Sequence, residues 1–173
     1  MNNTTKNSRL IHASAETIYR AFTKHHALES WFVPEGMTAK THHFKWTEGG
    51  GYEMSLYYSE SGKEVQGKTA AKEDRYKAEI RKLIPNKLIV LAINFDSKDP
   101  LFKGEMTLEI IMDEKENGTT VTFSFKDIPA GIKPEDNEKG TISTLENLAK
   151  YTEDEKEIDE QYSDGSANAF EDK

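Results

Sequence analysis

Two pairs of adjacent histidines, His25–His26 and His42–His43, are the residues of this sequence that most readily suggest metal chemistry. Neighbouring side chains point about 100° apart on a helix and to opposite faces on a strand. Neither pair is therefore expected to chelate one ion easily, and the histidines show no H-x-H or H-x-x-x-H spacing. The sequence predicts no metal site, and no motif in it indicates a cofactor.

Groups for covalent or acid–base catalysis are equally sparse. The chain has no cysteine and no G-x-S-x-G motif, which argues against a thiolate or an activated serine nucleophile. Gly49, Gly50 and Gly51 precede an alternating strand pattern instead of a helix, so they indicate a hairpin turn and not a phosphate loop. No catalytic residue is predicted. Four glutamates lie on predicted strands, most of them with outward parity: Glu53, Glu79, Glu105 and Glu109.

Apolar and aromatic side chains offer a different chemistry, the binding of an apolar molecule. They recur at every second position of several strands, where methionine adapts to varied shapes and tyrosine adds a polar tip. Such residues either fill a packed core or line a cavity, and Trp31 and Phe32 either plug that core or close a cavity mouth. His42 shares strand parity with Phe44 and Trp46, so it is either a satisfied core histidine or the polar group of the site. The candidate ligand-binding residues are Trp31, Phe32, His42, Tyr52, Met54, Tyr76, Met106, Leu108, Phe123 and Leu145.

Alternating and helical periods predict the elements that would position these side chains. A first short strand, with Leu10 facing inward, precedes two short helices between Ser14, a good N-cap, and Pro34. The continuous apolar run over residues 88–95 indicates a central strand, and residues 59–74 are expected to form a long loop. Strands are predicted over residues 8–12, 37–46, 52–58, 75–84, 88–95, 105–113 and 119–126.

The last predicted element is a long helix. It begins at Pro134, which suits a first helical turn, and it is expected to end at about Tyr151. Spacings of three and four place four apolar residues on one of its faces: Ile142, Leu145, Leu148 and Ala149. A run of strands followed by a helix indicates an α+β domain, in which an antiparallel sheet of six or seven strands curves around that helix.

Most of the negative charge is in the C-terminal tail. Residues 153–173 hold nine acids and two lysines, whereas residues 1–152 hold 22 acids and 21 bases, so −7 of the net charge of −8 belongs to the tail. The nearly neutral body has no field to attract nucleic acid, and no apolar run is long enough for stable membrane insertion. The first ten residues lack the apolar core of a signal peptide, so a cytoplasmic protein is expected. We expect one domain over residues 8–152 and a largely disordered tail over 153–173.

Several segments, in order, resemble a known family: IYRAFTKHHALESWF, EGGGYEMSLYY, KLIPNKLIVLAINF, GEMTLEII, NGTTVTFSF and DNEKGTISTLENLAKY. They are similar to the activator of heat-shock-protein-90 ATPase homologue-like family, within the START-like, helix-grip superfamily. The resemblance spans roughly residues 9–152. It implies a sheet that grips the C-terminal helix around a pocket, often for a small apolar ligand. The wider superfamily includes lipid carriers, polyketide cyclases, hormone receptors and co-chaperone domains.

Three functions are compatible with these patterns. The first is non-catalytic binding of a small hydrophobic or amphipathic molecule between the sheet and the C-terminal helix. The second is a cyclase- or dehydratase-type reaction in the same pocket, which a buried histidine or glutamate with a strongly shifted pKa would support. The third is an interaction module for a chaperone or another protein partner, which an exposed apolar patch would support. The inward methionine and tyrosine residues favour the first.

Overall fold

The computed structural model describes residues 3–34, 36–58 and 73–166, and side chains as far as Glu153. A seven-stranded antiparallel sheet has the order β1-β7-β6-β5-β4-β3-β2, so β5 is the central strand, as its apolar run predicted. The strands are β1 (Thr5–Ile11), β2 (Met37–Lys45), β3 (Gly51–Tyr58), β4 (Glu73–Ile84), β5 (Leu88–Phe95), β6 (Met106–Lys115) and β7 (Gly118–Lys126). The loop predicted over 59–74 lies outside the described residues, except for Glu73 and Asp74 at the start of β4.

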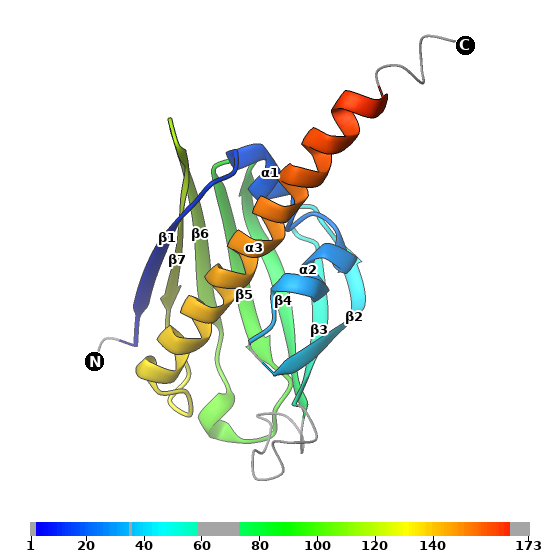
Figure 1. Ribbon diagram of the computed structural model, residues 1–173. Coiled ribbons are helices and arrows are strands. Elements are labelled where there is room, and N and C mark those ends of the chain that lie inside the picture. Colours follow the sequence, from blue (N-terminus) through cyan, green and yellow to red (C-terminus); the bar gives the residue numbers. More distant parts are fainter. Residues whose placement is uncertain (1–2, 35, 59–72, 167–173) are drawn as a thin grey trace.

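Three α-helices of the described residues cover one face of this sheet (Figure 1). They are α1 (Ala15–Arg20), α2 (His25–Trp31) and α3 (Pro134–Ser166), with a short 3-10 turn over Pro100–Phe102. Ser14 caps α1, because its side chain accepts a hydrogen bond from the backbone N–H of Thr17. The long helix α3 crosses the sheet diagonally, and the strands curve around it (Figure 1). The fold is therefore the α+β helix-grip arrangement that the sequence predicted.

The buried face of α3 differs in part from the predicted one. Leu145, Leu148 and Ala149 are buried, but Ile142 is 49% exposed. Three threonines complete the stripe that faces the sheet: Thr141, Thr144 and Thr152. These threonines were missed because their hydroxyls look polar in sequence, although each donates to a carbonyl of the preceding helical turn.

Two other local predictions are wrong. On β1, Ile11 is fully buried and Leu10 is 39% exposed, because adjacent strand residues point to opposite faces and only one of this apolar pair can face the helices. The helix α3 continues to Ser166 instead of ending near Tyr151. Residues 152–164 are mostly glutamate, aspartate and lysine with no proline or glycine, so nothing in them breaks a helix. The division into a domain over 8–152 and a tail over 153–173 stays a prediction.

A helix that crosses a lipid bilayer needs about 20 consecutive, mostly apolar residues. Within residues 3–34, 36–58 and 73–166, no helix combines the length and the apolar character needed to cross a membrane.

The buried apolar residues form one hydrophobic cluster between the helices and the sheet. Every strand except β2 contributes fully buried apolar side chains to this cluster from its helix-facing side.

Candidate functional site

A cavity of about 230 Å³ lies between the N-terminal half of α3 and the helix-facing side of the sheet. Ordinary small-molecule sites occupy about 300–1,000 Å³, so this cavity suits a compact ligand. Five strands and two helix ends contribute to its walls. The lining residues are Phe32, Pro34, Leu56, Asp74, Tyr76, Ile93, Phe95, Met106, Phe123, Phe125, Ile132, Asp136, Asn137, Gly140, Thr141 and Thr144.

Aromatic rings give the cavity a rigid apolar wall. The ring centroids of Phe32 and Phe123 are 6.3 Å apart, and those of Tyr76 and Phe95 are also 6.3 Å apart in an edge-to-face arrangement. On the opposite side, a Cβ placed on Gly140 would meet no heavy atom within 4 Å apart from its own helix. A glycine in mid-helix costs about 1 kcal/mol relative to alanine. Here it leaves space inside the cavity.

Polar groups of the cavity are concentrated at Asp74 and along α3. Asp74 is only 1% exposed, and its Oδ2 accepts a 2.6 Å hydrogen bond from the hydroxyl of Tyr58. Thr141 and Thr144 donate to the carbonyls of Asn137 and Gly140, each at 2.8 Å, so their oxygens remain available only as acceptors. No lysine, arginine or histidine belongs to the described lining. The polar part of the site is therefore acidic and rich in acceptors.

Two buried tyrosines form a pair beside the cavity. The rings of Tyr52 and Tyr76 are 5.9 Å apart, and the Tyr76 hydroxyl lies 3.4 Å from Sδ of Met54. Burial raises the pKa of Tyr52 to about 12. Burial also raises the pKa of Tyr76 well above its ordinary value, and the neighbouring Tyr52 raises it further. Both phenols therefore stay protonated at neutral pH and are suited to hydrogen bonding, not to proton abstraction.

Comparison with protein families assigns the chain. The family model of Activator of Hsp90 ATPase homolog 1-like proteins matches residues 12–153, most of the sequence. The chain belongs to this family. A search of curated proteins gave no match.

Solved structures support the same fold for this member of the family. A protein from Chromobacterium violaceum is 27% identical, with a TM-score of 0.78 over 87% of this chain and 97% of the other. A protein from Staphylococcus epidermidis is 20% identical, with a TM-score of 0.69 over 90% and 92% of the two chains. The Activator of Hsp90 ATPase homolog 1-like protein from Aeromonas hydrophila is 13% identical, with a TM-score of 0.65 over 87% and 92%. The last two likenesses concern the fold alone.

The structure of this family member brings four of the predicted ligand-binding residues into the cavity lining: Phe32, Tyr76, Met106 and Phe123. Five others are buried but stand outside the lining: Trp31, Tyr52, Met54, Leu108 and Leu145. Trp31 has the role of a core plug, since its Nε1 donates to the Ala21 carbonyl at 2.9 Å and its ring packs 4.7 Å from that of Phe22. Phe32, and not Trp31, is the neighbour that reaches the cavity.

His42 is the predicted site residue that the fold places elsewhere. Pairing of β2 with β3 shifts between Thr41 and His43, so His42 is the extra residue of a β-bulge. It is exposed, and its Nε2 lies 2.8 Å from Oγ of Ser55, whose parity is opposite to that of the inward Met54. The prediction that His42 shares the face of Phe44 is wrong. One added residue reverses the inward and outward alternation of the strand residues that precede it.

Asp74 is the main cavity residue that the sequence predictions missed. The sequence predicts a loop over residues 59–74, but Asp74 pairs with Leu56 inside the ladder. Asp74 is two residues before Tyr76 and therefore points to the same face. Extending the predicted strand over 75–84 by one residue includes it. The polar residues Asn137, Thr141 and Thr144 were missed because the apolar period of α3 passes over them.

Proposed function

We propose that this protein binds one small amphiphile in the cavity between α3 and the sheet and leaves it chemically unchanged. The observation that carries the proposal is a lining that combines a ring-lined apolar wall with acceptor-rich polar groups at Asp74 and along α3. A ligand with a short apolar body and a hydrogen-bond-donating head matches both parts.

The apolar wall supplies affinity. Each Å² of apolar surface removed from water contributes about 25 cal/mol. Phe32 and Phe123 already pack against each other, and Met106 is 4% exposed, so the wall requires little ordering when a ligand enters. Preorganisation of this kind lowers the entropic cost of binding. The volume of about 230 Å³ restricts the apolar body to a short chain or a small ring.

The polar part supplies selectivity for the head group. Asp74 and Asp136 contribute carboxylates, and the hydroxyl hydrogens of Thr141 and Thr144 are already donated to the helix backbone. A carboxylate head would meet like charge and find no basic partner in the described lining. An amine or a hydroxyl could donate to these oxygens. We therefore infer that the ligand is an apolar amine or alcohol instead of a fatty acid.

A cyclase- or dehydratase-type reaction is the second candidate, because the buried carboxylate of Asp74 stands beside the cavity and could exchange a proton with a bound ligand. Among the residues that the structure describes, no histidine or glutamate is buried. The third candidate, a chaperone or other protein partner, has less support. It would use an exposed apolar patch, and among the exposed large apolar side chains the ladder places Ile84 and Ile111 on either side of Leu88. The others are Leu10, Tyr57, Leu101 and Ile142.

The test combines a search for a natural ligand with a matched probe series. Native mass spectrometry of protein purified from its own host would detect a retained small molecule. Calorimetric titration with octylamine, 1-octanol and octanoate then separates the head groups, which differ while the apolar body stays the same. We expect the amine to bind most tightly and octanoate most weakly. Equal affinities would contradict the proposed head-group selectivity. Chemical conversion of the natural ligand by the protein, seen as a change in the mass of the ligand, would favour an enzyme.

Two leucine substitutions provide the structural control. Gly140→Leu fills the cavity from α3, where there is open space, and we expect it to abolish amine binding. Lys139→Leu adds the same side chain to the neighbouring exposed position and should leave binding unchanged. If both variants bind octylamine as the native chain does, the ligand does not occupy this cavity. Stimulation of a chaperone ATPase, assayed in parallel, would support the protein-partner alternative.

A further inference from the structure

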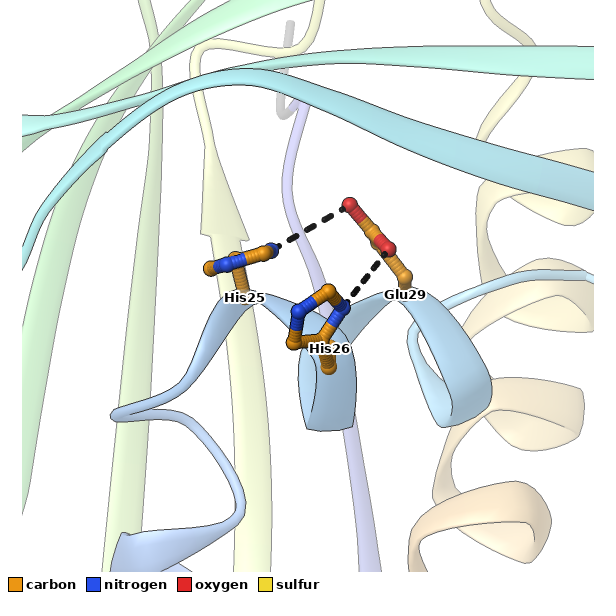
Figure 2. A group of neighbouring side chains, drawn as sticks. All are labelled: His25, His26 and Glu29. Carbon is orange, nitrogen blue, oxygen red and sulfur yellow. Dashed lines mark ion pairs between the residues drawn. The ribbon is translucent and has the colours of Figure 1, made fainter.

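Three potential metal ligands converge on one side of α2, outside the cavity lining. Figure 2 shows the side chains of His25, His26 and Glu29 turned toward one another. Nδ1 of His25 lies 3.7 Å from Oε1 of Glu29, and Nδ1 of His26 lies 3.8 Å from Oε2 of the same carboxylate. The donor atoms of all three residues lie within 4.8 Å of one another.

These spacings suit a shared cation better than direct hydrogen bonds. A nitrogen–oxygen hydrogen bond spans about 2.7–3.2 Å, so both His–Glu separations are too long for one. Two ligands that each lie about 2.1 Å from a Zn²⁺ ion at a tetrahedral angle are about 3.4 Å apart. The three donor atoms lie within 4.8 Å of one another, so side-chain shifts of about 1 Å, at histidines that are largely exposed, would bring them to that geometry.

Neighbouring parts of the fold hold the carboxylate in position. Oε1 of Glu29 accepts a 2.8 Å hydrogen bond from the backbone N–H of Thr41, which stands at the β-bulge of β2. The ring of Phe44 lies 5.9 Å from that of His25 and limits its movement. Support of a ligand by surrounding groups is characteristic of metal sites.

The histidines are accessible to an ion from solvent. The side chains of His25 and His26 are 44% and 83% exposed, and that of Glu29 is 23% exposed. The adjacent histidines alone point too far apart to chelate, as the sequence indicated. Glu29 lies one helical turn later and bridges them with its two oxygens, so the relevant pattern is H-H-x-x-E at the start of a helix.

We propose that His25, His26 and Glu29 form a surface site for one divalent transition-metal ion of the Zn²⁺ type. Two imidazoles and a carboxylate are ligands that suit Zn²⁺, Ni²⁺ and Cu²⁺ and disfavour Mg²⁺ and Ca²⁺. Three protein ligands leave one tetrahedral position for water or an exogenous group. A bound ion would also connect α2 to β2 through Glu29 and Thr41.

Zn²⁺ titration of the full chain by calorimetry tests the site. We expect one ion per chain, at micromolar affinity, for the native protein. His26→Ala removes a ligand at the most exposed position and should weaken Zn²⁺ binding by on the order of tenfold or more. His43→Ala removes an exposed histidine from the adjacent strand and serves as the matched control, for which no change is expected.

A second measurement separates coordination from general charge effects. Co²⁺ bound by nitrogen and oxygen donors in a tetrahedral site absorbs visible light, and we expect this absorption in the native chain and in His43→Ala but not in His26→Ala. Glu29→Gln should weaken the band as well, and a thermal melt without metal shows whether that variant stays folded. The proposal is overturned if the native chain shows no stoichiometric Zn²⁺ binding, or if His26→Ala and His43→Ala bind equally.

Discussion

The hydroxyl of Tyr58 donates a 2.6 Å hydrogen bond to Oδ2 of Asp74, at the edge of the cavity. Burial first, and then the hydrogen bond and negative charge of Asp74, raise the pKa of Tyr58 above its ordinary value. The phenol thus stays neutral and helps to hold a carboxylate that is only 1% exposed. This pair joins β3 to β4 and orients the most buried charged group of the candidate site.

Replacing the phenol should destabilise the fold. Tyr58→Phe removes one donor from a buried carboxylate, and we expect the free energy of unfolding to fall by about 1–3 kcal/mol. Urea denaturation measures this loss. Tyr57→Phe, at the neighbouring and more exposed position, is the matched control. Equal effects of the two substitutions would show that the contact with Asp74 contributes nothing specific.

Alkaline pH should destabilise the protein through its buried tyrosines. The pKa of Tyr52 is about 12 in the folded chain, above the value of about 10 in the unfolded chain. The unfolded state therefore releases this proton first, so the stability is fully present below pH of about 10 and is lost as pH rises toward the folded pKa. Each such tyrosine adds a slope of about 1.4 kcal/mol per pH unit within that window.

Denaturation at several alkaline pH values checks this dependence. Tyr52→Phe should flatten the slope, because the variant has no proton to lose at that position. Tyr57→Phe again serves as the control. An unchanged slope in Tyr52→Phe would mean that alkaline unfolding has another origin.

A methyl group at position 140 should stabilise the protein and weaken ligand binding. Gly140→Ala gains helix propensity of about 1 kcal/mol, and its Cβ would stand in open space inside the cavity. We expect a higher midpoint in urea and a lower affinity for octylamine. A decrease in stability would indicate that the helix needs glycine at this position for a reason other than the cavity.

The predicted division between domain and tail can be tested by truncation. A chain ending after Asp154 keeps Thr152, which is fully buried, and Glu153, whose Oε1 accepts a hydrogen bond from the backbone N–H of His12 at 3.1 Å. We expect its melting temperature to match that of the full chain, measured by circular dichroism. A large drop in melting temperature would place residues beyond Asp154 within the cooperative unit.

Strand alternation predicted much of the framework of the site. Tyr52, Met54 and Tyr76 face the helices as their spacing required, because an inward position recurs at every second residue. The same rule failed at His42, because the β-bulge adds a residue to the strand and no residue type nearby in the sequence indicates a bulge. It failed at Asp74 for another reason. A carboxylate in sequence indicates an exposed loop, but a hydrogen-bond donor such as Tyr58 offsets the free-energy cost of burying it.

Local periodicity predicts the order of strands and helices and the long final helix, since each element depends on residues within about ten positions of one another. The cavity does not. Its walls come from segments as distant in sequence as Phe32, Tyr76 and Thr141. Its volume is the space between α3 and the sheet that the side chains leave unfilled. Pairing register, the face of α3 that turns inward and the meeting of His25 with Glu29 are likewise set by packing between elements, which no single segment encodes.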